Sequence, residues 1–379
     1  MAGGQLARGG SEPMLRLTPG TSIAFIDDQP IIVSEARRAL FEVNQIGGYI
    51  GCRLEDGVSL GQLAEEVKER GFGPASAMLR SVLADWSQSG LVCATDAPPS
   101  TPPVLVQPIE LAGARLVLRH HDPALAARVA PLFAHLQRAG QGADIVYDLW
   151  SAHGLALLNR DGGRASVLHA DQVGPLVKAR FTQDMLDDSR SGLALHAGCL
   201  HRGGRALLLT GAPGAGKTTL NAWLLGAGFA YDGDDITLLR ADGRVRGLPF
   251  LPTIKSGAWP LMARRFPARF GSAIHLRPDG KRVRYLTPPA WATAGPVPIG
   301  WIIKLRRTRA GAARLVPMHP AAAIRHLLSE AASASGAVDA ATLGTLIRAV
   351  TAARSHELHY HDLDEAARLI AGLCDDGAA

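Results

Sequence analysis

Residues 211–219 read Gly-Ala-Pro-Gly-Ala-Gly-Lys-Thr-Thr and lie between an apolar run, 206–209, and an apolar helix-forming run, 220–225. Glycines let backbone N–H groups surround an anion, and the dipole of a helix start favours negative charge. In this spacing Lys217 reaches the β- and γ-phosphates of a nucleotide, and the Thr218 hydroxyl can ligate Mg²⁺. The alternative is a glycine-rich turn that fits the pattern by chance. The motif predicts a nucleotide-binding loop made of Gly211, Ala212, Pro213, Gly214, Ala215, Gly216, Lys217, Thr218 and Thr219.

The composition of the 379 residues is that of an ordinary folded chain: 47% are hydrophobic and 20% charged, which argues against global disorder. No apolar stretch approaches the ~18 residues of a membrane span, and no sustained apolar segment follows Met1 as in a signal peptide. The cysteines at 52, 93, 199 and 374 form no C-x-x-C pair, so the spacing indicates neither a zinc site nor a disulfide framework. We therefore expect a cytoplasmic protein without a membrane partner. The net charge of +6 is compatible with nucleic acid, phosphate ligands or an acidic peptide.

Prolines mark one domain boundary. Residues 96–103 read Asp-Ala-Pro-Pro-Ser-Thr-Pro-Pro, which cannot continue a helix or a central strand, and an extended linker is expected at 98–103. The preceding residues, 1–97, contain short strand-like runs within 21–33 and three helical patterns. The second of these begins at Ser59, where Gln62 completes a capping box. This pattern predicts a small α+β domain.

Two further regions follow the linker. Residues 104–195 alternate strand-like runs with a helical stretch near 124–136, and we expect an α+β intermediate region whose role the motifs do not indicate. Residues 196–379 contain the loop, several strands and three helical patterns, at 321–332, 340–353 and 363–374. A phosphate site at the carboxyl end of a strand is typical of the α/β class.

A group of aspartates follows the predicted loop helix: Asp232, Asp234 and Asp235 separate two apolar runs. One carboxylate of an adjacent pair can bind Mg²⁺ while the other accepts a proton from an attacking hydroxyl. The alternative is that the aspartates only form a turn around Gly233. His196, expected just before the strand that feeds the loop, can share that proton or be a hydrogen-bonded packing residue.

The spacing of His196, the loop and the pair Asp234-Asp235 resembles the catalytic domain of the HPr kinase/phosphorylase family. The resemblance covers roughly residues 190–305. It implies an α/β P-loop kinase core, ATP and Mg²⁺ as cofactors, and proton transfer from a serine hydroxyl. By position it makes Asp234 the base and His196 its helper, with Lys217 on the phosphates. Thr218 and Asp235 would then hold the metal.

The family's Glu-Ile-Arg-Gly element is matched at best by residues 253–257, Thr-Ile-Lys-Ser-Gly. The metal-supporting glutamate is absent, and lysine keeps the charge of the arginine but loses its bidentate fork. Because the element serves the reverse, phosphorolytic reaction, we expect a kinase without that reaction. Lys255 is a candidate contact of the transferring phosphoryl group, the alternative being a solvated lysine beside a turn.

The first domain resembles the PqqD-like peptide-binding domains that accompany enzymes modifying ribosomally made peptides. The likeness lies in residues 44–57, in 58–67 and in the closing Ser-Gly-Leu-Val at 89–92. Such winged-helix-like domains accept a leader peptide as an added strand. A structural winged helix or a DNA reader remains an alternative, although helix 75–88 carries only Arg80 as a basic residue, which disfavours nucleic acid.

One more segment, 262–284, carries seven basic residues and the single acid Asp279. Its prolines and glycines favour a loop or hairpin, which can grip nucleotide or an acidic peptide, or can be a solvated surface. Taken together, the sequence predicts a cytoplasmic ATP-dependent kinase that phosphorylates a hydroxyl, expected to be serine, on a precursor peptide whose leader the first domain captures. A small-molecule kinase and a non-catalytic nucleotide-binding regulator remain alternatives, and a homo-oligomer is left open.

Overall fold

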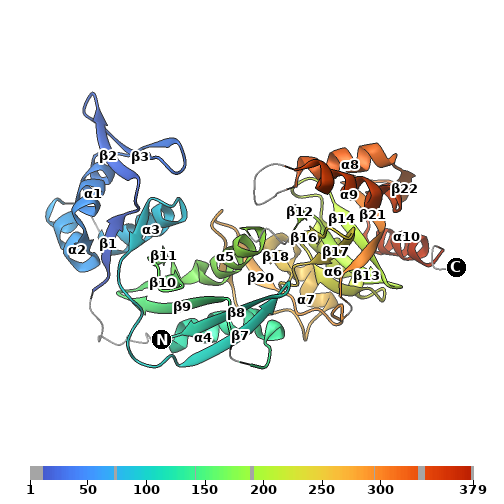
Figure 1. Cartoon of the computed structure of the whole chain (residues 1–379), viewed down its shortest axis with the longest axis horizontal. Helices are drawn as coiled ribbons and strands as arrows, with labels where there is room; N and C mark the ends of the chain where they lie inside the picture. The colour runs from blue at the N-terminus through green and yellow to red at the C-terminus, as the bar shows by residue number, and fades with distance from the viewer. Residues whose placement is uncertain are drawn as a thin grey trace. The chain divides into compact units, whose positions relative to one another are not determined.

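A computed structural model describes residues 12–71, 75–140, 142–187, 192–293, 295–331 and 338–376 (Figure 1). It is a mixed α/β protein with two compact units. The first unit comprises residues 1–176 with 275–280, and the second comprises 177–274 with 281–379. The boundary between the units therefore lies inside the region expected at 104–195. In the described part of the chain, no helix has the length and apolarity needed to cross a membrane.

The first unit begins with two small antiparallel sheets. In one, β1 pairs with both β5 and β6, and in the other β3 lies between β2 and β4. Asp27 and Asp28 join β2 to β3 with φ values of 47° and 62°, the left-handed backbone that a two-residue hairpin turn requires. The strands are β1 (Met14–Leu17), β2 (Thr21–Ile26), β3 (Gln29–Ser34), β4 (Ala39–Glu42), β5 (Val58–Ser59) and β6 (Val92–Ala94).

Three helices complete this part, as the sequence pattern predicts: α1 (Gln45–Asp56), α2 (Leu60–Glu69) and α3 (Ala75–Gln88). The Ser59 side chain accepts a hydrogen bond from the Gln62 N–H, which confirms the predicted helix start. Leu54, Leu63 and Leu83 are fully buried between the helices and the strands.

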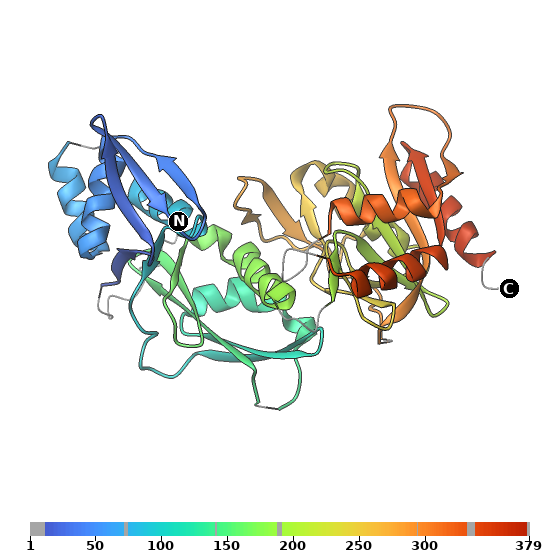
Figure 2. The same cartoon turned by 45° about the horizontal axis from the view of Figure 1, so that its top comes forward.

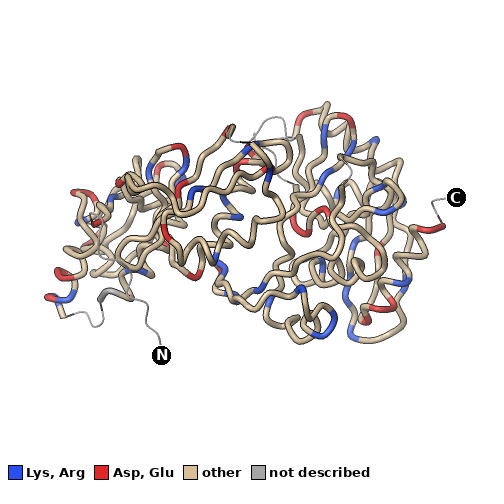
Figure 3. Tube along the Cα trace, turned by 90° about the horizontal axis from the view of Figure 1, so that it is seen from below, with Lys and Arg blue, Asp and Glu red and all other residues tan. Residues whose placement is uncertain are grey.

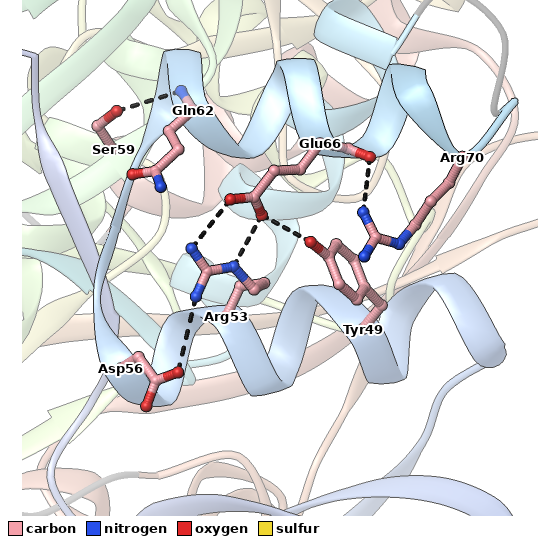
Figure 4. A network of polar contacts seen from close by, with 7 residues as sticks. All are labelled: Tyr49, Arg53, Asp56, Ser59, Gln62, Glu66 and Arg70. Atoms are coloured by element: carbon pink, nitrogen blue, oxygen red, sulfur yellow. Dashed lines mark hydrogen bonds and ion pairs between the residues drawn. The ribbon is translucent and has the colours of Figure 1, made fainter.

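A polar network joins α1 to α2 (Figure 4). The Arg53 guanidinium donates to both oxygens of Glu66, at 2.7 and 3.0 Å, and the Tyr49 hydroxyl donates to Glu66 Oε2 at 2.6 Å. Arg70 lies 3.8 Å from the centre of the Tyr49 ring, close enough for a cation–π contact. These hydrogen bonds, led by that of Arg53, lower the pKa of Glu66 to about 2.

A five-stranded sheet with helix α4 (Pro123–Val129) forms the rest of the first unit, and green ribbons mark most of it in Figure 2. Its order is β11-β10-β9-β8-β7. Trp150, Leu155 and Leu157 of this sheet belong to the same apolar core as the helices before the linker, so residues 12–94 pack on it. The strands are β7 (Leu105–Leu111), β8 (Ala114–His120), β9 (Ile145–Ala152), β10 (Leu155–Arg160) and β11 (Ser166–Leu168). Residues 96–103 form neither helix nor strand, as expected.

The second unit is built on a nine-stranded mixed sheet. The strand that feeds the loop, β14, runs parallel to β21, which runs parallel to β23 on its other side, while β13 and β15 are antiparallel. The strands are β12 (Leu193–Leu195), β13 (Gly198–Arg202), β14 (Arg205–Thr210), β15 (Ala230–Gly233), β16 (Thr237–Leu239), β17 (Arg244–Gly247), β21 (Val297–Arg307), β22 (Arg314–Pro317) and β23 (Arg354–Tyr360).

Helices pack on both faces of this sheet. Leu207 and Leu209 of β14 face a core that includes α6 (Lys217–Leu225), α7 (Trp259–Arg265) and α10 (Leu363–Asp375). Leu208, on the opposite face because strand side chains alternate, packs with α8 (Pro320–Ser329) and α9 (Ala340–Thr351). Outside the sheet are α5 (Val173–Asp187), β18 (Thr253–Lys255), β19 (His275–Leu276) and β20 (Arg282–Tyr285), of which β18 pairs with β20. Part of the helical pattern predicted at 321–332 lies outside the described residues.

Candidate functional site

The predicted loop connects the carboxyl end of β14 to the first residue of α6. Gly211, Gly214 and Gly216 have φ values of 140°, 87° and 94°, which L side chains rarely adopt. A Cβ on Gly216 would also lie 2.5 Å from the Tyr360 hydroxyl, whereas one on Gly214 would meet nothing within 4 Å. Ala212, Pro213 and Gly214 are exposed. The sequence therefore folds locally into the strand, glycine loop and helix that an anion cradle requires.

Lys217 begins the helix, and its ammonium group folds back over the loop. Its Nζ donates to the Gly211 carbonyl oxygen at 2.5 Å. Burial lowers the pKa of Lys217, and the nearby charge of Lys255 lowers it further, while Glu330 and Asp235 oppose the change. An anion in the loop would favour the charged form of this amine.

Asp234 follows β15 and is 4% exposed. The Thr218 side chain acts on it as a hydrogen-bond donor, which links the carboxylate to the loop. The Tyr231 hydroxyl lies 3.3 Å from its Oδ1, and the Thr253 N–H lies 3.4 Å from its Oδ2. Burial raises the pKa of Asp234 despite the opposing charge of Lys178. A carboxylate held this way has a raised affinity for a proton.

Asp235, the next residue, is 54% exposed in its side chain and lies 3.6 Å from His196 (Oδ1 to Nδ1). His196 is in the short connection between β12 and β13. The prediction that it directly precedes the strand feeding the loop is wrong, because β13 intervenes and returns antiparallel to β14. The pairing of β12 with β16 and of β13 with β15 brings His196 toward the residue after Asp234. The structure thus brings together the histidine and the second carboxylate.

Lys255 ends β18, and its neighbour Thr253 contacts Asp234 through the backbone. Its charge acts on Lys217, so the strand brings a second cation to the loop. The Thr253 hydroxyl accepts a hydrogen bond from Lys178 Nζ at 3.2 Å. Thr253, which stands where the family has glutamate, therefore supplies a backbone donor and a hydroxyl but no carboxylate.

Three residues near the loop were not found by sequence reasoning. Lys178 comes from α5, in a region without a motif. The Tyr360 hydroxyl, from the end of β23, donates to the Ala215 carbonyl at 2.7 Å. His326 Nε2, from α8, lies 3.0 Å from the Thr210 hydroxyl. Their sequence separations from the loop, up to 145 residues, left no local signal.

Asp232 does not join its two neighbours. It lies within β15, 4% exposed, and its Oδ2 accepts from the Gly247 N–H at 2.6 Å. It contacts Cys199 and His201 of β13. The hypothesis that all three aspartates only form a turn does not describe Asp232, which is a strand residue.

The basic segment, expected to be a loop or hairpin over 262–284, begins in helix α7, which the expectation did not include, and continues through strand β19 into strand β20. Two of its cations stack on Trp259: Arg284 at 4.4 Å and Arg282 at 5.6 Å from the ring centre. Since β20 pairs with β18, Arg284 is opposite Ile254, beside Lys255. Along the described part of the trace, basic and acidic residues are interspersed (Figure 3).

The first unit presents free sheet edges. In the sheet of β2, β3 and β4, the two outer strands have no second partner in the described part of the chain. Large apolar side chains near these edges are exposed: Phe25 at 56%, Ile26 at 55% and Leu40 at 62%. An extended peptide can add to such an edge through backbone hydrogen bonds.

No family model matches the chain, and no curated protein matches it either.

Proposed function

We propose that this protein is an ATP-dependent kinase of the HPr kinase-like type that phosphorylates a serine hydroxyl on a ribosomally made precursor peptide. The observation that carries the proposal is the connection from the glycine loop through Thr218 to the buried Asp234. A phosphate cradle alone supports nucleotide binding. A carboxylate of raised pKa joined to that cradle supports proton transfer as well.

The donors around the loop fit a nucleotide with Mg²⁺. The Thr218 hydroxyl and the exposed Asp235 carboxylate are hard oxygen ligands of the kind that Mg²⁺ prefers. When bound, Mg²⁺ neutralises charge on the β- and γ-phosphates. Lys217 and Lys255 supply further positive charge, and the backbone N–H groups of Gly214, Gly216, Lys217 and Thr218 bind the phosphate oxygens.

In the proposed reaction the serine oxygen attacks the γ-phosphorus. A new O–P bond forms while the bond from the γ-phosphorus to the β,γ-bridging oxygen breaks, and ADP leaves with that oxygen. Asp234 accepts the hydroxyl proton, and its raised pKa suits this task. His196, beside Asp235, passes the proton onward to solvent. Most of the rate advantage comes from alignment and charge stabilisation.

The geometry also fits the opposite assignment, in which Asp235 is the base and Asp234 is the metal ligand. The reason is that the Thr218 side chain, which would hold the metal, donates a hydrogen bond to Asp234. Titrating Mg²⁺ separates the two. If Asp234 is the base, Asp234→Asn loses phosphoryl transfer at every Mg²⁺ concentration, by about 10²–10⁴-fold. Asp235→Asn then raises the Mg²⁺ concentration needed for half-maximal rate. The opposite pattern assigns the proton to Asp235.

The kinase proposal itself is tested by mass spectrometry of a precursor peptide incubated with enzyme, ATP and Mg²⁺. The expected result is a single phosphorylated serine, absent with Lys217→Ala. If ATP is bound but neither a peptide nor a small molecule gains phosphate, the protein is a nucleotide-binding regulator. If only a small molecule gains phosphate, peptide capture is wrong.

Leader capture rests on the free edges of the β2-β3-β4 sheet and on the likeness to winged-helix, PqqD-like domains. Deleting residues 1–97 is a poor test, because it would expose Trp150 and Leu157 of the five-stranded sheet. Leu40→Glu, at an exposed edge position, should weaken leader binding about tenfold or more in fluorescence anisotropy, in line with the loss of one interface anchor. Ile347→Glu, at a 43% exposed position on α9, is the matched control. Equal effects of the two variants would contradict the assignment.

A further inference from the structure

A thiol, an imidazole and a carboxylate converge in the second unit away from the loop. The side-chain donor atoms of Cys199, His201 and Asp232 all lie within 4.8 Å of one another. His201 Nε2 is 3.1 Å from Asp232 Oδ2, and Cys199 Sγ is 3.7 Å from the same oxygen. In the described part of the chain, no other group of three such residues comes together in this way.

Strand geometry and a β-bulge bring the three side chains together. Cys199 and His201 are two residues apart on β13, so both project from one face of the sheet. On β15 the register jumps from Gly233 opposite Cys199 to Tyr231 opposite Leu200, which makes Asp232 the extra residue of a β-bulge. A bulge re-aims a side chain, and here it turns the carboxylate toward the thiol and the imidazole.

Hydrogen bonding does not account for the imidazole. Cys199 is fully buried and His201 is 7% exposed, yet His201 Nε2 has no hydrogen-bond partner. It lies 3.1 Å from Asp232 Oδ2 but forms no hydrogen bond with that oxygen. A buried ring nitrogen without a partner is costly in a native structure.

We propose that Cys199, His201 and Asp232 bind a zinc ion. The mixed sulfur, nitrogen and oxygen donors suit Zn²⁺, whereas Mg²⁺ and Ca²⁺ require oxygen donors alone. Three protein ligands leave one position of a tetrahedron for water. The site is distinct from the ATP site, since Asp234 and Asp232 have different partners.

The surroundings are those of a supported metal site. The Gly247 N–H donates to Asp232 Oδ2 at 2.6 Å. Such contacts orient metal ligands. The ion would tie β13 to β15, the strand that leads into Asp234.

The test is the metal content of the full chain purified without chelator, measured by inductively coupled plasma mass spectrometry. We expect about one zinc per chain, lost in Cys199→Ser and in His201→Asn. Cys374→Ser, at another buried cysteine of the second unit, is the matched control and should keep its zinc. Retention of zinc by the Cys199 and His201 variants would overturn the assignment.

A variant that fails to fold would also lose its metal, so the parent chain provides an independent readout. After removal of metal with a chelator, Co²⁺ should produce the thiolate-to-cobalt charge-transfer band and the intense visible bands of a tetrahedral site. A parent chain that contains no zinc and gives no such bands would show that the trio is a metal-free polar cluster. Neither measurement requires kinase activity, so its outcome is independent of the proposed function.

Discussion

Glu66 in the first unit and Asp234 in the second are both carboxylates that interact with a tyrosine hydroxyl and are close to a basic side chain, but their pKa values move in opposite directions. Glu66 is 22% exposed at its side chain and is gripped by Arg53. Its pKa falls to about 2. Asp234 is almost fully buried, no ion pair is formed with it among the described residues, and its pKa rises.

The difference separates a carboxylate that stabilises the fold from one that the proposed mechanism uses as a base. Glu66 is most stable as an anion, because Arg53 and Tyr49 donate hydrogen bonds to its carboxylate. These contacts stabilise the packing of α1 on α2. Asp234 is held where its charge is disfavoured, which costs folding free energy but gives it affinity for a proton. The comparison predicts that neutralising each carboxylate has opposite consequences for stability and for activity.

The largest expected effect is that of Asp234→Asn on phosphoryl transfer, a loss of about 10²–10⁴-fold in rate. The same change should leave the free energy of unfolding of the second unit within about 1 kcal/mol of the parent, because a buried charge is removed together with one hydrogen-bond acceptor. Turnover by mass spectrometry and hydrogen exchange of amides in 217–225 measure the two quantities. A variant that loses activity and stability in parallel would make Asp234 a structural residue like Glu66.

The converse substitution is Glu66→Gln. It removes the charge that Arg53 and Tyr49 bind, and we expect the first unit to lose about 1–2 kcal/mol, a value reduced for the partial exposure of the pair. ATP turnover should not change. Hydrogen exchange of amides in 45–69 reports the loss, and exchange in 217–225 serves as the internal control. Unchanged exchange of the amides in 45–69 would contradict a structural role for Glu66.

The depressed pKa of Glu66 also predicts a pH dependence. Because the folded pKa is about 2 and the ordinary value is 4.5, the stabilisation is complete above pH 4.5 and is lost as the pH falls toward 2. The first unit should therefore become less stable over that interval, and Glu66→Gln should remove this component. Exchange of the same amides at a series of pH values measures it. Persistence of the full acid dependence in the variant would point to another carboxylate.

The sequence predicted what depends on local pattern. The three helices ahead of the linker and the start at Ser59 follow from residues within a few positions of each other, and the structure confirms them. The glycine segment 211–216 does lie between a strand and a helix, as its local pattern indicates. Helix α5 and its Lys178 were missed because the region carries no motif and its apolar spacing is weak. The sequence analysis also did not predict that residues 12–94 pack on the five-stranded sheet. A proline-rich linker does not indicate whether the segments on its two sides pack against each other.

The candidate site was predicted in part for the same reason. Spacing along the chain singled out Lys217, Asp234 and His196, but the approach of His196 to Asp235 depends on the pairing of β12 with β16 and of β13 with β15. Tyr360 and His326 reach the loop from strands and helices more than 100 residues away. The cluster of Cys199, His201 and Asp232 depends on a bulge, which no cysteine spacing can indicate.

Removal of a single hydroxyl in the first unit should have the weakest effect on its stability. Tyr49→Phe removes one hydrogen bond to Glu66 but keeps the ring over which Arg70 lies. We expect a loss of about 1 kcal/mol in the first unit and a rise in the pKa of Glu66, because one of the two donors that lower it is gone. The acid loss of stability should therefore be smaller and be complete at a higher pH. Tyr360→Phe, which removes a hydroxyl bonded to the loop in the second unit, is the matched control and should leave exchange in 45–69 unchanged. Equal shifts in both variants would mean that the measurement does not report on the Glu66 network, and no shift with Tyr49→Phe would leave Arg53 as the group that fixes the pKa of Glu66.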